Sequence, residues 1–487
     1  MSIAKHTVYI ALGQVLPIAV SLATVPLYLH TIGLDRYGIL SICWLVLGYF
    51  GLFDLGLGRA IAQKIASLRD APHGERSQVF WTAIGMNAGL TVLACLLFVP
   101  LVIWGFDLLK FSSPEQKAEL ERAIPWLAAI LPVALLGGVL TGALEGRERF
   151  GFLSSVNTLG SVAMSTLPLG TALLFGPDIR LLVAASLAAR LLTMTLLFVG
   201  CWKFVPLSRP EGPDRRLLGK LLSYGGWITV SSVIGPLLYL WDRFVVGATL
   251  SASAVAVYVV PQNLTGYILI IPGALSGAMF PRFSAESGED AARLARDALT
   301  FLTCLMTPLV IGAILVIGPF LHLWVGSKVA EQAAPLAYVL LIGTWANSLA
   351  RVPLSRLQGQ GRPDLAAKTH AAELVPYAVV LFAMVKAFGL VGVAISWTLR
   401  CVADTLVLIF LAERNRRPLQ DLVPPFALVS LAAATAYALP FDQPIRWIVL
   451  MMILGVSVIL AWRTMPANVR AQLLSVHARW NPIARGG

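Results

Sequence analysis

The sequence predicts an all-α polytopic membrane protein of about fourteen transmembrane helices. Of its 487 residues, 57% are hydrophobic and 13% are charged, and the mean hydropathy is +0.79. A water-soluble globule of this length could not bury so much apolar surface. Similar segments also recur about 210 residues apart, which indicates an internal duplication. The predicted architecture is therefore two pseudo-symmetric six-helix bundles followed by two further helices.

Hydropathy places the individual spans, because about 20 apolar residues cross a bilayer as a helix. The first span is expected to be retained rather than cleaved as a signal peptide, since its apolar run is too long and lacks a small-residue cleavage site. The expected spans of the first half are 9–29, 37–57, 78–105, 122–143, 151–175 and 181–203. Those of the second half are 219–241, 254–280, 298–324, 334–356, 365–387 and 389–412, with two more at 422–440 and 446–462.

Basic residues predict the orientation of these spans. With a cytoplasmic N-terminus, the cytoplasmic side receives 26 of the 37 lysines and arginines, the other side receives nine, and two lie inside spans. Such a bias follows the positive-inside rule. Both termini are therefore expected in the cytoplasm. The net charge of +12 reflects this bias and attraction to anionic membrane lipids, so it does not indicate a nucleic-acid partner.

Three pairs of segments carry the repeat. VAASLAAR (Val183 to Arg190) matches VAISWTLR (Val393 to Arg400), LEGRERFGFL matches LQGQGRPDLA, and HTIGLDRYGILS weakly matches GATLSASAVAVYVV. An even number of spans per unit makes the repeats parallel, and such halves commonly enclose a central cavity that opens to alternate sides. The expected parts are a bundle at 1–205, a cytoplasmic linker at 206–217, a bundle at 218–415, two extra helices at 416–462 and a basic cytoplasmic tail at 463–487.

Motifs for catalysis are missing from the sequence. It has no GxxxxGK[ST] phosphate loop, no HExxH and no DxD pair, and these are the residue patterns that ATP hydrolysis and metal-dependent transfer use. The five cysteines lie in apolar spans without CxxC spacing and are interpreted as small buried hydrophobic residues. We therefore expect no catalytic residues, no metal, no cofactor and no enzymatic activity.

Arg190 and Arg400 are the candidate substrate-binding residues with the clearest physical argument. An arginine at mid-bilayer depth costs at least roughly 2.5–3.5 kcal/mol on insertion scales, so both are expected to point inward. Asp404 lies one turn after Arg400, which leaves a local ion pair and a substrate contact equally open. Arg190 has no carboxylate three or four residues away. Its partner is expected on another helix, at a backbone carbonyl or on a ligand.

The remaining ionisable residues near spans have two interpretations each. Asp54 and Asp242 are either coupling sites for an ion or proton, or capping and interfacial residues. Glu373 either titrates during transport or pairs with Arg190, Arg351 or Arg400. Arginines at cytoplasmic span ends either snorkel as topology determinants or line the mouth of a cationic cavity. The candidate cationic set comprises Arg190, Arg400, Arg59, Arg351 and Arg356, and the candidate coupling or ion-pair carboxylates are Asp54, Asp242, Glu373 and Asp404.

Five stretches together resemble a known family. They are GLDRYGILS, FDLGLGRA, YLWDRFVVGATLSASAVAVYVVPQNL, LQGQGRPD and GLVGVAISWTL, and their order is similar to that in polysaccharide transporters, the Wzx-like O-antigen flippases of the MOP exporter superfamily. The resemblance implies a MATE-like fold with a V-shaped cavity and no invariant catalytic set. It also implies transfer of an undecaprenyl-pyrophosphate-linked oligosaccharide to the outer leaflet of the bacterial inner membrane. The transfer would serve lipopolysaccharide or other polysaccharide synthesis and would be driven by cation or potential coupling. A glycan polymerase and chain-length machinery are further partners it suggests.

Three alternatives remain open from the sequence. A MATE-like drug or metabolite antiporter shares the architecture, although an exporter of organic cations should favour carboxylates over arginines in its cavity. A lipid II flippase has a similar cationic cavity and differs in the glycan. A membrane glycan polymerase or ligase usually carries a large external loop, whereas the longest outer loop expected here is 106–121.

Overall fold

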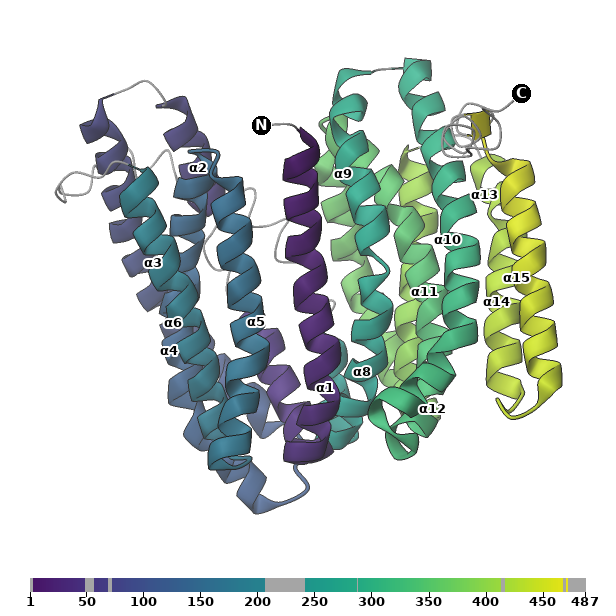
Figure 1. Cartoon of the computed structure of the whole chain (residues 1–487), viewed down its shortest axis with the longest axis horizontal. Helices are drawn as coiled ribbons and strands as arrows, with labels where there is room; N and C mark the ends of the chain where they lie inside the picture. Colours follow the sequence, from purple (N-terminus) through teal and green to yellow (C-terminus); the bar gives the residue numbers. More distant parts are fainter. Residues whose placement is uncertain are drawn as a thin grey trace, which may run out of the picture. The chain divides into compact units, whose positions relative to one another are not determined.

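The computed structural model describes residues 3–48, 57–68, 72–205, 241–286, 288–412, 417–466 and 470–471. All regular secondary structure in these ranges is helical (Figure 1). The chain divides into two compact units, Met1–Ala256 and Val257–Gly487. The predicted linker 206–217, nearly all of the predicted span 219–241, and the tail beyond residue 471 lie outside the described residues.

The helices of the first unit follow the predicted spans of the first half. They are α1 (Ile3–Gly48), α2 (Leu57–Ser67), α3 (His73–Asp107), α4 (Pro114–Glu145), α5 (Phe150–Phe175) and α6 (Ile179–Phe204). Helix α8 (Ala252–Tyr267) begins in this unit and ends in the second. The long helices α4, α5 and α6 pack against one another, and α1 lies along α5.

The second unit contains the remaining described helices. Its helices are α9 (Ile270–Ala285), α10 (Gly288–Val325), α11 (Ser327–Gly359), α12 (Pro363–Ala412), α13 (Arg417–Asp421), α14 (Val423–Ala438) and α15 (Pro444–Thr464). Helix α11 is central, because it packs against α9, α10, α12 and α14. Helices α14 and α15 form an adjoining pair, and both contact α10 (Figure 1).

Two glycines divide long helices into pairs of spans. Gly33 in α1 has φ 77° and ψ 169°, and Gly389 in α12 has φ 57° and ψ −133°. These left-handed conformations cost a residue with a Cβ atom far more than they cost glycine. The helical path therefore breaks at both points. The segments on either side coincide with 9–29 and the first part of 37–57 in α1, and with 365–387 and 389–412 in α12.

The prediction of an all-α polytopic membrane protein is confirmed. Among the described residues, ten helices are long and apolar enough to cross a membrane, or eleven if the bent pair α8 and α9 is one span. Because α1 and α12 each hold two predicted spans, every predicted span except 219–241 coincides, wholly or in large part, with a described helix.

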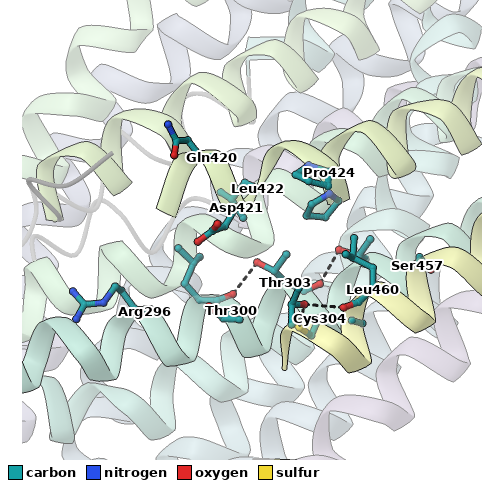
Figure 2. Close-up of a pocket in the computed structure, with 15 residues that line it drawn as sticks. Arg296, Thr300, Thr303, Cys304, Gln420, Asp421, Leu422, Pro424, Ser457 and Leu460 are labelled. Carbon is teal, nitrogen blue, oxygen red and sulfur yellow. Dashed lines mark hydrogen bonds between the residues drawn. The ribbon is translucent and has the colours of Figure 1, made fainter. Parts of the chain in front are cut away.

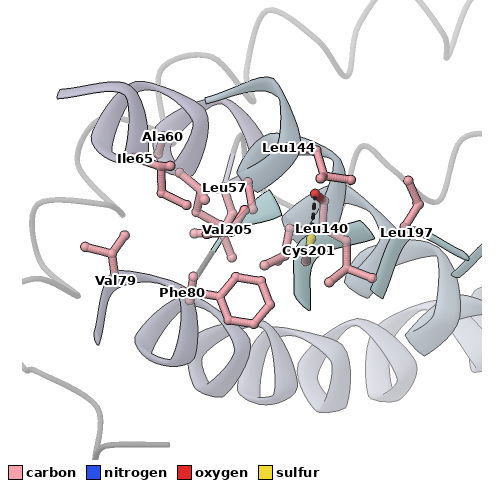
Figure 3. Packing of buried hydrophobic residues seen from close by; sticks show 14 of the residues in the cluster. Leu57, Ala60, Ile65, Val79, Phe80, Leu140, Leu144, Leu197, Cys201 and Val205 are labelled. Carbon is pink, nitrogen blue, oxygen red and sulfur yellow. Dashed lines mark hydrogen bonds between the residues drawn. The ribbon is translucent and has the colours of Figure 1, made fainter. Parts of the chain in front are cut away.

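The first unit is held together on one side by a hydrophobic cluster between α2, α3, α4, α5 and α6. Figure 3 shows Phe80 beneath Leu140 and Cys201, with Leu144 and Leu197 further along the same contact. The thiol of Cys201 donates a hydrogen bond to the carbonyl oxygen of Leu140 at 3.4 Å. This bond satisfies a weak polar group inside an otherwise apolar layer.

Helices α2 and α4 approach each other closely enough that one glycine admits no side chain. A Cβ atom on Gly142 would lie 2.1 Å from the carbonyl oxygen of Gly58. Close backbone approach through small residues is a common way for membrane helices to pack.

We expect Gly142→Ala to lower the stability of the protein by roughly 1–3 kcal/mol, because the new methyl group must push α4 away from α2. The change is measured as a lower thermal unfolding midpoint of the purified protein in detergent. Gly137→Ala is the matched control on the same helix, since a Cβ atom there meets nothing within 4 Å. Equal unfolding midpoints for the two variants would contradict the close contact.

Candidate functional site

Arg190 lies on the face of α6 that is turned into the first unit. Ser186, one turn earlier, is fully buried, and the neighbouring Ala189 is 1% exposed. The hydroxyl group of Ser186 donates to the carbonyl oxygen of Leu182 at 3.0 Å and accepts a hydrogen bond from Trp44 Nε1 at 3.1 Å. The helix therefore presents this face to α1, and Arg190 is half-buried along it.

The guanidinium group of Arg190 has no protein partner among the described residues. Its Nε atom is buried without a hydrogen-bond acceptor, and within that part of the chain no hydrogen bond or ion pair engages the side chain. A cation that is half-buried in a membrane protein and is not neutralised is energetically costly. Such a charge is suited to attract an anion.

An aromatic group on α1 adjoins this region and is not among the sequence candidates. The rings of Tyr28 and Trp44 meet edge to face with centroids 5.4 Å apart, and Tyr37 lies 6.0 Å from Tyr28. The Tyr28 hydroxyl donates to the carbonyl oxygen of Ser165 on α5 at 2.9 Å. Only the recurrence of large aromatic residues along the first two spans signals this group in the sequence.

In the second unit, four charged or titratable side chains gather between the two segments of α12. Arg400 on the second segment pairs with Glu373 on the first, with an N–O distance of 3.7 Å. Asp404, one turn beyond Arg400, lies 3.4 Å from His370 Nε2. The Arg400 guanidinium carbon also lies 5.6 Å from the centre of the Tyr377 ring. The ion pairs therefore join residues 27 and 34 positions apart in sequence, across the break at Gly389.

The Glu373–Arg400 pair borders a cavity of about 590 Å³ that is formed entirely by α12. Its lining is mostly apolar, and Lys368 and Thr369 stand with the pair among the polar members. The apolar lining comprises Leu365, Ala372, Pro376, Tyr377, Val380, Leu399, Ala403, Val407 and Leu411. A cavity with apolar walls and a few charged groups is suited to an amphipathic ligand.

The other candidate residues do not belong to the group of side chains on α12. Arg59 on α2 is exposed and interacts electrostatically with Glu145. Arg356 on α11 is only 7% exposed, and Arg351 is half-buried with an unbonded Nε atom. Asp242 is fully buried in the first unit. Asp54 lies outside the described residues, and within them no His, Cys, Asp or Glu cluster could hold a metal ion.

A larger cavity of about 750 Å³ lies between α10, α13, α14 and α15 (Figure 2). Several hydroxyl groups line it, but those of Thr303, Thr307 and Ser457 donate to carbonyl oxygens of their own helices. Cys304 and Thr464 contact each other at 3.3 Å. These hydroxyl groups are therefore already satisfied, and the charged side chains of Arg296 and Asp421 also line the cavity.

Comparison with known proteins defines the family. A model of the family described as "Polysaccharide biosynthesis protein" matches residues 3–286, more than half of the chain. A Shigella flexneri protein named "Putative O-antigen transporter" is 31% identical over 418 residues, which cover 85% of this chain and 98% of that protein. The chain belongs to the polysaccharide biosynthesis protein family.

Other relatives of this chain are more distant. A Haloferax volcanii protein named "Probable low-salt glycan biosynthesis flippase Agl15" is 20% identical over 418 residues. The aligned residues make up 84% of this chain and 83% of that protein. A MatE family model matches residues 228–384. The resemblance to Wzx-like transporters inferred from the sequence is thereby confirmed.

Solved structures place this family member in the MOP fold. The lipid II flippase MurJ in an inward closed conformation gives a TM-score of 0.69 at 13% identity, covering 93% of this chain and 98% of the other. An inward-facing MATE transporter of the MOP superfamily gives 0.67 at 16% identity, covering 83% and 97%. At these identities the likeness establishes the fold. The family match and the similarity to the Shigella flexneri protein, together with this fold, identify the chain as a multi-pass membrane protein of a transporter family and not an enzyme.

Proposed function

We propose that the protein moves a lipid-linked oligosaccharide, carried on undecaprenyl pyrophosphate, from the inner to the outer leaflet of the bacterial inner membrane. The observation that carries the proposal is Arg190 on the interior face of α6, which is unpaired within the described part of the chain. A guanidinium group recognises phosphate oxygens by charge-assisted, often bidentate, hydrogen bonds. The names of the relatives from Shigella flexneri and Haloferax volcanii support the same substrate class.

The proposed mechanism is alternating access between two repeats of six spans, with both termini in the cytoplasm. Arg190 and Arg400 occupy equivalent positions of the repeat, and the burial of their helices supports this. Val183 and Val393 are both buried, and so are Ser186 and Ser396, whose hydroxyl groups each donate to the carbonyl oxygen four residues earlier. Arg59, Arg351 and Arg356 would extend the cationic path. Asp54, Asp242, Glu373 and Asp404 are the candidates for cation coupling.

The head and the tail of the proposed substrate suit different surroundings in the transporter. A diphosphate head needs cationic partners and a hydrated path, whereas a polyprenyl tail is as apolar as the lipid around it and can remain outside the protein. No covalent bond changes, so the missing catalytic motifs are consistent with transport. Glycan polymerase and chain-length proteins would act on the product in the outer leaflet.

The proposal is tested by reconstituting the purified protein in vesicles that hold a lipid-linked oligosaccharide labelled with a fluorophore on the sugar. A membrane-impermeant quencher added outside should extinguish label from both leaflets when the protein is present, and only the outer-leaflet label in protein-free vesicles. Quenching that stops at the outer-leaflet level with protein present would contradict the proposal.

A MATE-like antiporter is the second candidate, because the MatE model matches residues 228–384. Such a protein should transport cationic dyes, for which carboxylates are the natural partners. Here Glu373 and Asp404 already pair with Arg400 and His370. Uptake of a cationic dye, measured in the same vesicles, would indicate the antiporter. Transfer of lipid II instead of the labelled oligosaccharide would indicate a lipid II flippase.

A further inference from the structure

The larger cavity, of about 750 Å³, has charged side chains toward one side and mostly apolar walls beyond them. Figure 2 shows Arg296 on α10 and Asp421 on α13 toward one side, and Leu460 on α15 toward the other. Both charged side chains are exposed. The volume lies within the range of about 300–1,000 Å³ that is usual for sites of small ligands. The apolar lining comprises Leu299, Leu422, Pro424, Pro425, Leu460 and Ala461.

The charged side of the cavity coincides with a predicted boundary of the membrane. Arg296 precedes the predicted span 298–324 by two residues, and Asp421 precedes the span 422–440 by one. The apolar lining lies within these spans and 446–462, at the depth of the hydrocarbon layer. A molecule in this cavity therefore has its polar part at head-group level and its apolar part among lipid tails, which is how a phospholipid is oriented.

The two charged side chains have opposite signs and do not neutralise each other. Among the described residues, no ion pair or hydrogen bond engages Arg296 or Asp421. Arg470 also lies nearby and interacts electrostatically with Cys304, but its guanidinium group donates to two carbonyl oxygens at the end of α15, at 3.0 and 3.2 Å. The lining itself thus offers a ligand one cation and one carboxylate.

We propose that this cavity binds a membrane phospholipid with a primary amine in its head group, such as phosphatidylethanolamine. The lipid phosphate meets Arg296, because guanidinium groups suit phosphate oxygens. The ammonium group meets Asp421, because it supplies N–H donors to a carboxylate. The acyl chains lie against the apolar lining. Since lipid tails are as apolar as leucine, the chains gain little from burial in a membrane, and the head group determines which lipid binds.

The bound lipid would join parts of the second unit that otherwise meet only by side-chain packing. Helices α14 and α15 follow the second predicted repeat and pack on α10. Arg296 belongs to α10, whereas Asp421 ends α13 immediately before α14. A zwitterionic head group between them therefore links this pair of helices to α10. Because a ligand stabilises the folded form that binds it, we expect phosphatidylethanolamine to raise the thermal unfolding midpoint of the protein in detergent.

The experiment compares lipids that differ only in the head group. Native mass spectrometry of the full-length protein in detergent gives the dissociation constant of the first bound lipid for phosphatidylethanolamine, phosphatidylcholine and phosphatidylglycerol with the same acyl chains. We expect phosphatidylethanolamine to bind at least about fivefold tighter than phosphatidylglycerol, the size expected for one exposed ion pair. Phosphatidylcholine should fall between them, because its quaternary ammonium keeps the charge and has no N–H donor.

Three substitutions separate the contacts. Asp421→Asn should lower the affinity for phosphatidylethanolamine about fivefold without lowering that for phosphatidylglycerol, because only the amine meets this carboxylate. Arg296→Ala should weaken all three lipids to a similar extent, since each carries a phosphate. Ala461→Phe, which places a ring in the cavity, should reduce binding of all three at least about tenfold.

Each variant has a matched control outside the cavity lining. Asp442→Asn lies at the opposite end of the α14–α15 pair, Arg293→Ala is three residues before Arg296 on α10, and Ile459→Phe is on the exposed face of α15. None of the three should change the order or the strength of lipid binding.

Phosphatidylglycerol binding as tightly as phosphatidylethanolamine would overturn the proposal, and so would a preference for the amine that persists in Asp421→Asn. Displacement of phosphatidylethanolamine by an equal concentration of undecaprenyl phosphate would also overturn it, because the cavity would then belong to a polyprenyl carrier. None of these measurements involves transport, so the proposed function stands or fails separately in the vesicle assay.

Discussion

Replacing both Arg190 and Arg400 by alanine is expected to slow lipid-linked oligosaccharide transfer at least about a hundredfold. Each guanidinium group that contacts the pyrophosphate contributes about 1.5–3 kcal/mol, which corresponds to roughly a factor of ten or more in binding. The measurement is the initial rate of quenching of labelled glycan in vesicles, normalised to the amount of protein reconstituted.

The two single variants should reduce the transfer rate to different extents. Arg190 has no partner among the described residues, so its full charge is free for the substrate, whereas Arg400 must first leave Glu373. Arg190→Ala should therefore reduce the rate more than Arg400→Ala. Arg190→Lys should fall between Arg190→Ala and wild type, because lysine keeps the charge and loses the planar fork of donors.

Arg180→Ala is the matched control for this series. Arg180 is on the same helix as Arg190, but its side chain is 43% exposed and lies 3.7 Å from Asp178. Its loss should leave the rate unchanged, since an exposed ion pair of this kind contributes at most about 1 kcal/mol to stability. A double alanine variant that transports at the wild-type rate, with normal folding, would remove Arg190 and Arg400 from the substrate path.

Glu119→Ala is expected to destabilise the protein by about 3 kcal/mol or more. Glu119 accepts hydrogen bonds from Arg36 Nε at 3.0 Å and Arg36 Nη2 at 2.6 Å, and from the backbone amide of Ile179 at 3.5 Å. One carboxylate thus ties α1, α4 and α6 together at one end of the first unit. Removing it leaves Arg36, only 25% exposed, without its counter-charge, and breaking a buried pair typically costs about 3–5 kcal/mol.

Thermal unfolding in detergent measures this effect. Glu121→Ala, two residues further along α4, is the control, because Glu121 is 58% exposed and lies 3.8 Å from Lys117. That substitution should change stability by no more than about 0.5 kcal/mol. A double replacement of Arg36 by methionine and Glu119 by leucine should recover part of the loss, since well-packed apolar residues can substitute for a buried ion pair. Comparable unfolding midpoints for Glu119→Ala and Glu121→Ala would refute the assigned role.

The positions of the spans were predictable from the sequence because bilayer crossing depends on a local property, the hydropathy of about 20 consecutive residues. The partner of Arg400 was not singled out, because the sequence left Glu373 open to pairing with Arg190, Arg351 or Arg400. Spacing along one helix favours Asp404, four residues away, whereas Arg400 forms its ion pair with Glu373 on the other segment of α12. That pairing depends on the register of two packed segments, which is set by the break at Gly389 and by side-chain packing rather than by local spacing.

In the first unit, too, contacts between distant segments could not be predicted from local sequence patterns. The role of Glu119 depends on three helices meeting at one point, and no pattern in 106–121 indicates it. The serines of the repeated octapeptides, by contrast, carry a local signal, since each hydroxyl group bonds within its own helix. Interactions that span one or two helical turns are therefore predictable from the sequence, and those that join distant segments are not.

The unpaired charge of Arg190 has an electrical consequence for the empty transporter. Moving one elementary charge through about 100 mV changes the free energy by about 2.3 kcal/mol. In the proposed alternation, an inside-negative potential would draw an uncompensated guanidinium group toward the cytoplasmic side, and so would favour the conformation that is ready for the next substrate. The Glu373–Arg400 pair carries no net charge and would be indifferent to the same field. Of the two repeat-related arginines, Arg190 in the first unit would then contribute to the voltage dependence of the return step.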